Sequence, residues 1–137
     1  MIKNIKACIF DLDGTLVDSM WMWPDIDREY LKRFGIEYDD NLKNEIDGIS
    51  FHETAVYFKN KFSISDSVEK ICEDWEDMAY DKYKYEVKEK PCCKKFLEHI
   101  RSKGIKMGIA TSNNRSMVDV VLKSLNMKDF FEVITTS

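Results

Sequence analysis

The 137-residue sequence contains little proline or glycine and no long hydrophobic run. Its two prolines and five glycines exclude collagen-like and proline-rich linker proteins. No segment approaches the roughly 20 consecutive apolar residues that a membrane helix needs. Residues 1–10 also lack the apolar stretch of a signal peptide. We therefore expect a cytoplasmic protein with no membrane partner.

Charge and cysteine content exclude further classes of protein. The 21 basic and 25 acidic residues give a net charge of −4, which argues against a nucleic-acid partner. The four cysteines include no C-x-x-C pair, so we expect neither a zinc site nor a disulfide framework. Apolar residues make up 44% of the chain and charged residues 34%, which fits a globular protein with one core and a modest insertion.

Short apolar runs and helical patterns alternate along the chain. Strands are predicted at residues 5–10, 105–110 and 131–135, with a helix before the second strand and another before the third. Residues 24–85 show helical patterns only, so they interrupt this alternation after the first strand. Alternating strands and helices predict an α/β fold, a Rossmann-like parallel sheet with right-handed crossovers. These elements assign residues 1–16 and 89–137 to the core and residues 17–88 to an inserted helical cap.

Two patterns inside the helical segment mark helix starts. Ser50 with Glu53, and Asp66 with Glu69, fit the capping box, in which side chains satisfy the first free N–H groups of a helix. An apolar stripe at helical spacing follows the second pattern. This stripe predicts the buried face of a long helix, and it consists of Val68, Ile71, Cys72, Trp75, Met78 and Ala79.

Polar turns follow the first two predicted strands. Asp11, Asp13 and Gly14 come directly after the first strand, and residues 111–114 (TSNN) come directly after the second. Because the carboxyl ends of parallel strands meet at one edge of the sheet, we expect both turns at one site. Asp11 and Asp13 project to the same side of an extended chain, and a divalent cation such as Mg²⁺ would relieve their repulsion. Taken alone, these residues also fit a solvated turn and a plain helix N-cap.

The two turns resemble the motifs of a known family. DLDGTLVDS at residues 11–19 resembles the first signature motif of the haloacid dehalogenase-like (HAD) superfamily, and TSN at residues 111–113 resembles its second. The helical insertion resembles the small cap of the branch that contains β-phosphoglucomutase and phosphoglycolate phosphatase, including a cap loop at residues 48–50. The resemblance extends over the whole chain, and it implies a HAD-like core with a helical cap that opens and closes over the site.

The resemblance also implies a Mg²⁺-dependent phosphatase mechanism. Asp11 would be the nucleophile that forms an aspartyl-phosphate, and Asp13 would be the general acid and then the general base. Mg²⁺ would be held by the Asp11 carboxylate and the Asp13 backbone carbonyl. The Thr111 hydroxyl and the backbone N–H groups of Ser112 and Asn113 would bind phosphate. The expected partner is a small phosphorylated metabolite, a phosphate monoester.

The cap loop bears on the choice of substrate. Gly48, Ser50 and His52 are the candidate substrate contacts there. Hexose-phosphate mutases of this branch place basic residues around the loop, whereas Asp47 and Phe51 flank it here. This difference favours a simple phosphatase and leaves a phosphohexomutase as the alternative enzyme.

The chain departs from the family pattern after its third strand. In the family a lysine and then one or two acidic residues follow that strand, and this sequence ends at Ser137 before either. The strand that would pair with the free side of residues 5–10 is also missing, so we expect a core that is incomplete at its C-terminus, with an exposed edge. That edge would accept a completing polypeptide or a second copy of the chain. We expect weak metal binding and little catalysis from this chain alone, so a catalytically incomplete binding or assembly module is the alternative of another class.

Overall fold

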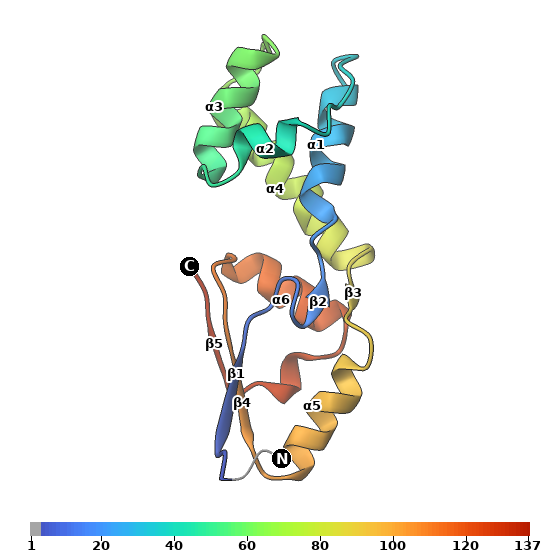
Figure 1. Ribbon diagram of the computed structural model, residues 1–137, viewed down its shortest axis with the longest axis vertical. Helices are drawn as coiled ribbons and strands as arrows, with labels where there is room; N and C mark the ends of the chain where they lie inside the picture. Colours follow the sequence, from blue (N-terminus) through green and yellow to red (C-terminus); the bar gives the residue numbers. More distant parts are fainter. Residues whose placement is uncertain (1–3) are drawn as a thin grey trace. The chain divides into compact units, whose positions relative to one another are not determined.

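The computed structural model describes residues 4–137, which form two compact units (Figure 1). The α/β unit comprises the residues up to Met20 together with Tyr80–Ser137, and the helical unit comprises Trp21–Ala79. The helical unit is shorter than the insertion expected at residues 17–88. Residues 17–20 and 80–88, which include the end of the fourth helix, belong to the α/β unit. No helix within residues 4–137 is both long enough and apolar enough to cross a membrane.

A three-stranded parallel sheet forms the centre of the α/β unit. The strands lie in the order β1-β4-β5 and pair in parallel, as the alternating pattern predicts. Both crossovers move in the same direction along the sheet, so right-handed connections place both helices on one face, and Figure 1 shows α5 and α6 on the same side. The elements are β1 (Ala7–Phe10), α5 (Cys93–Ser102), β4 (Lys106–Ala110), α6 (Arg115–Ser124), the 3-10 helix η1 (Lys128–Phe130) and β5 (Val133–Thr135).

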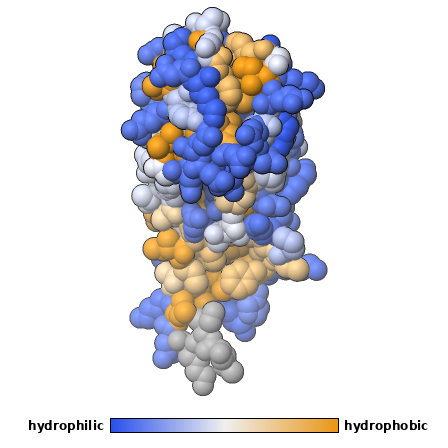
Figure 2. Space-filling model, turned by 45° about the horizontal axis from the view of Figure 1, so that its top comes forward, coloured by the Kyte–Doolittle hydropathy of each residue, from blue (hydrophilic) through white to orange (hydrophobic). Residues whose placement is uncertain are grey.

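The two faces of this sheet differ in burial. On the face beneath the helices, Met107 and Ile109 are buried, and the Phe10 ring packs edge-on against Phe96 and Phe131, with centroids 6.2 and 6.3 Å apart. The opposite face is open: Ile9 is 76% exposed and Val133 is 63% exposed. Figure 2 shows apolar surface reaching solvent on this unit. Within the part of the chain that the structure describes, β1 pairs only with β4, so the expected edge strand is confirmed.

A two-residue ribbon joins the segments that lead into and out of the helical unit. β2 (Val17–Asp18) and β3 (Lys88–Glu89) pair antiparallel, and the Lys90 Nζ lies 3.1 Å from Asp18 Oδ1. The sequence patterns do not predict this ribbon, because two residues are too few to show alternation.

The helical unit contains the predicted run of helices. Ser50 caps α3 with a full capping box: its Oγ accepts from the Glu53 N–H, and the Glu53 carboxylate accepts from the Ser50 N–H. The box predicted at Asp66 is wrong, because the hydroxyl of Ser67 accepts the N–H of Lys70 instead. The four helices are α1 (Met22–Lys32), α2 (Leu42–Ile46), α3 (Phe51–Lys61) and α4 (Val68–Tyr85), and α4 belongs to the α/β unit from Tyr80 onward.

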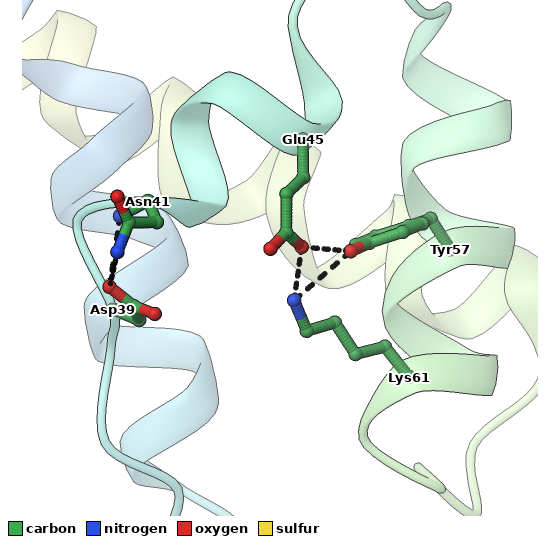
Figure 3. A network of polar contacts seen from close by, with 5 residues as sticks. All are labelled: Asp39, Asn41, Glu45, Tyr57 and Lys61. Carbon is green, nitrogen blue, oxygen red and sulfur yellow. Dashed lines mark hydrogen bonds and ion pairs between the residues drawn. The ribbon is translucent and has the colours of Figure 1, made fainter.

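Polar contacts tie the short helix α2 to its surroundings (Figure 3). Before α2, the Asp39 carboxylate accepts from the backbone N–H and the side-chain amide of Asn41, at 2.9 and 3.0 Å. Within α2, Glu45 accepts from the Tyr57 hydroxyl and from Lys61, both on α3. These hydrogen bonds are exposed, so they contribute little to the stability of the unit.

Asp27 is a buried carboxyl group on α1, 7% exposed. Burial raises the pKa of Asp27 from its ordinary value of 3.8 to about 7. Between these two values the folded chain retains a proton that the unfolded chain has lost, so stability falls as pH rises. At about 1.4 kcal/mol per pKa unit, the destabilisation reaches at most about 4 kcal/mol above pH 7.

We expect Asp27→Asn to stabilise the helical unit at alkaline pH, because the amide carries no charge to desolvate. Thermal unfolding followed by circular dichroism should give a higher midpoint for the variant at pH 8, with the difference shrinking as the pH approaches 4. Asp40→Asn, which alters an exposed acid of the same unit, is the control and should show no such trend. An equal effect of Asp27→Asn at both pH values would contradict the assignment.

Candidate active site

The site lies at the carboxyl ends of β1 and β4. Phe10 and Ile109 are partners in the parallel register, so Asp11 and Thr111 both lie just beyond the ends of adjacent strands. The Thr111 N–H donates to the Thr135 carbonyl (3.1 Å), which fixes the second turn to β5. The two polar turns therefore meet at one edge of the sheet, as the sequence predicts.

Alternation continues past β1 into the first turn. Leu12 is fully buried, Asp13 is half-buried and Asp11 is exposed. The Leu12 carbonyl accepts the N–H groups of Leu16 and Val17, at 2.9 and 3.2 Å, and this closes the turn. Burial of Leu12 thus leaves the two flanking aspartates on the outer side of the turn.

Asp13 accepts hydrogen bonds from three side chains. The hydroxyls of Ser19 and Tyr83 both donate to its Oδ1, each at 2.7 Å. The Asn113 side-chain amide donates to its Oδ2 at 3.0 Å. The carboxylate from the first turn is therefore held directly against a residue of the second.

Tyr83 also contacts the second turn. Its hydroxyl accepts from the Asn113 amide at 2.9 Å, and the side chain is 2% exposed. Burial, together with the adjacent Asp13 carboxylate, raises the pKa of Tyr83 far above its ordinary value. The phenol therefore stays protonated and acts as a hydrogen-bond donor.

The second turn is held by its own side chains. The Asn113 N–H donates to the Thr111 hydroxyl oxygen (3.1 Å), and Ser112 is exposed between them. α6 begins at Arg115 with Asn114 as its N-cap, so the helix starts later than the TSN segment. The Asn113 N–H, for which the family resemblance implies a role in binding phosphate, is thus engaged within the turn, while the Thr111 hydroxyl keeps its own proton to donate.

The cap-loop candidates belong to the helical unit. Gly48 has a φ of +80°, a left-handed conformation that favours glycine. Ser50 is the N-cap of α3, and His52 is exposed on the first turn of that helix.

Sequence reasoning assigned no role to Ser19 or Tyr83. Ser19 ends the first motif, but nothing in the motif shows which side chain its hydroxyl meets. Tyr83 lies four residues beyond Ala79, so it continues the apolar stripe of α4 by one turn. Extending the stripe would have predicted a buried tyrosine there, although not its partner.

Two protein oxygens in the first turn suit a divalent cation. The Asp11 carboxylate is exposed, and the Asp13 carbonyl is not among the acceptors that close the turn. Mg²⁺ commonly takes one or two carboxylates and fills its shell with water and substrate phosphate. Across residues 4–137 no three His, Cys, Asp or Glu side chains are grouped as metal ligands.

Comparisons with known proteins give one matching family and phosphatases of similar sequence. The family described as haloacid dehalogenase-like hydrolase matches residues 8–137. A phosphorylated carbohydrates phosphatase of Thermotoga maritima is 27% identical over 95% of this chain and 60% of its own length. The pyrophosphatase PpaX of Bacillus cereus is 28% identical over 97% of this chain and 60% of its own.

A solved structure is also similar to the chain over almost its whole length. A candidate β-phosphoglucomutase from Thermotoga maritima superposes with a TM-score of 0.87 at 26% identity, over 96% of this chain and 61% of that one. The chain therefore spans about 60% of the length of these three relatives. Their remaining length has no counterpart in the 137 residues.

Proposed function

Because the chain belongs to the haloacid dehalogenase-like hydrolase family, we propose that it is a Mg²⁺-dependent phosphohydrolase that acts on a small organic phosphate monoester. The strongest support is the hydrogen bond between Asp13 and Asn113, which joins two motifs 100 residues apart in the chain. If Asp13 only belonged to a solvated turn, and Asn113 only to an unrelated helix N-cap, neither role would require this contact.

In the proposed reaction the two aspartates have separate roles. A carboxylate oxygen of Asp11 attacks phosphorus, and the bond to the leaving oxygen breaks as Asp13 gives that oxygen a proton. Water then attacks the aspartyl-phosphate, and Asp13 takes a proton from it. Thr111 donates its hydroxyl to a phosphate oxygen, with the turn at Ser112 and Asn113 beside it. The Asp11 carboxylate and the Asp13 carbonyl would hold Mg²⁺, which would supply positive charge against the phosphate oxygens.

The relatives and the cap loop support a small substrate. The names of the two relatives point to phosphorylated carbohydrates and to pyrophosphate. We propose a phosphorylated metabolite of that size, with Gly48, Ser50 and His52 as its cap contacts, and a cytoplasmic location. Asp47 and Phe51 beside this loop make a second phosphate-binding point unfavourable, because neither residue carries positive charge.

Two other functions each have an observation in their favour. Similarity to a candidate β-phosphoglucomutase supports a phosphohexomutase, which would need a sugar bisphosphate primer and would yield an isomer rather than free phosphate. The open sheet face and the free edge of β1 support a binding or assembly module, completed by further polypeptide or by a second copy of the chain.

Metal removal tests the proposed activity. With Mg²⁺ present, glycerol phosphate or p-nitrophenyl phosphate should release inorganic phosphate, and EDTA should lower the rate at least about 100-fold by removing the cation that offsets phosphate charge. Adding back excess Mg²⁺ should restore the rate. Turnover that is unaffected by EDTA would contradict the proposed mechanism.

A further inference from the structure

Tyr83 completes a closed ring of hydrogen bonds with Asp13 and Asn113. The Tyr83 hydroxyl donates to Asp13 Oδ1 and accepts from Asn113 Nδ2, whose second hydrogen goes to Asp13 Oδ2, at 2.7, 2.9 and 3.0 Å. An amide nitrogen has two hydrogens to donate, and a phenol can donate and accept at once, so all three contacts form together. Such a ring restricts rotation of the Asp13 carboxylate.

The hydrogen bonds leave Asp13 one open acceptor position. A carboxylate offers about four acceptor positions, two on each oxygen. Both positions on Oδ1 are filled, by Ser19 and Tyr83, and one on Oδ2 is filled by Asn113. The remaining position lies on Oδ2. The three donors therefore leave one defined side of the carboxylate open for a reacting group.

We infer that Tyr83 is a positioning residue: its hydroxyl holds Oδ1, and this fixes the Asp13 carboxylate with the open position on Oδ2 available to the reacting groups. The inference rests on the proposed function for the role of Asp13. In that reaction Oδ2 is the atom that gives a proton to the leaving oxygen as its bond to phosphorus breaks and that later takes a proton from the attacking water. Tyr83 itself gives up no proton, because its hydroxyl stays directed at Oδ1.

The first test compares two substrates in the Tyr83→Phe variant of the 137-residue chain. The alkoxide of glycerol is a poor leaving group that needs a proton from Asp13, whereas p-nitrophenolate leaves readily without one. We expect kcat/KM for glycerol phosphate to fall about tenfold, the effect of one lost hydrogen bond to a charged group. For p-nitrophenyl phosphate kcat/KM should fall less than about threefold. This parameter reports only the steps up to loss of the leaving group, so the hydrolysis of the aspartyl-phosphate, which also uses Asp13, does not affect it.

The matched control is Tyr85→Phe. Tyr85 lies in the same last turn of α4 but is 64% exposed, so this variant should keep both rates. An equal loss of kcat/KM on the two substrates in Tyr83→Phe would show a merely structural role and overturn the inference.

A second readout does not depend on turnover. Hydrogen exchange of the Asn113 side-chain amide, followed by NMR, should be faster in Tyr83→Phe than in the wild type and unchanged in Tyr85→Phe, because Tyr83→Phe removes an acceptor. A wild-type chain without Asp11-dependent turnover would favour the binding or assembly module over the proposed hydrolase. Faster exchange in Tyr83→Phe would then still support the fixed position of the Asp13 carboxylate. An unchanged exchange rate overturns the inference in either case.

Discussion

Replacing Asp11 with asparagine is expected to abolish Mg²⁺-dependent hydrolysis of p-nitrophenyl phosphate. An amide is nearly the same size as a carboxylate, but it is neither an adequate nucleophile for phosphorus nor an anionic metal ligand. Losing the nucleophile should lower kcat at least about 1,000-fold, as in enzymes in which nucleophilic groups act as a unit. Release of p-nitrophenolate by wild type and variant, each with and without Mg²⁺, measures the effect.

The folded state needs a separate check in that comparison. Asp11 is exposed and takes part in no hydrogen bond that closes its turn, so the variant should unfold at the wild-type temperature. Asp81→Asn, at an exposed acid of the same unit, should keep full activity. Retained activity in Asp11→Asn would show that Asp11 is not the nucleophile. Absence of turnover in the wild type as well would favour the binding or assembly module.

The second large effect is expected from Trp75→Ala in the helical unit. Trp75 is 2% exposed, and its ring meets those of Tyr30, Phe51 and Phe58 edge-on, with centroids 5.8, 5.6 and 4.9 Å apart. Truncation leaves a cavity among these rings and should lower the free energy of unfolding by about 3–5 kcal/mol. That is a large share of the roughly 5–15 kcal/mol that stabilises a typical domain.

Urea denaturation followed by helical circular dichroism measures this loss. Val56→Ala removes an exposed side chain from α3 of the same unit, so it should change stability by less than about 0.5 kcal/mol. Trp75→Phe should fall between the two, since it keeps a ring and removes an indole N–H that has no partner within residues 4–137. A loss below about 1 kcal/mol for Trp75→Ala would contradict a core centred on this residue.

Patterns that repeat along the chain predict much of the fold. Alternating strands and helices give the parallel sheet and its edge strand, and the Ser50 capping box fixes the start of α3. Strand starts are less accurate: β1 begins at Ala7 rather than Ile5, and β5 at Val133 rather than Phe131. Apolar side chains outside a strand can pack as well as those inside it, as the Phe131 ring does against Phe10.

The candidate site is predicted only in part, for a different physical reason. The strand rule places Asp13 near Asn113 because both follow adjacent parallel strands. The contact with Tyr83 joins residues 70 apart and depends on where the last turn of α4 meets the first turn of the core. No periodic pattern in the sequence indicates that contact, so Tyr83 is identified as a partner of Asp13 only in the three-dimensional structure.

The central claim is that Asp11 attacks phosphorus, and trapping the phosphoenzyme tests it most directly. The chain is mixed with p-nitrophenyl phosphate and Mg²⁺, quenched in acid and digested, and its peptides are weighed by mass spectrometry. We predict one added phosphoryl group on the peptide that contains Asp11, and none in Asp11→Asn. Turnover of the substrate with no phosphoryl group on that peptide, or the same label in Asp11→Asn, would contradict the claim.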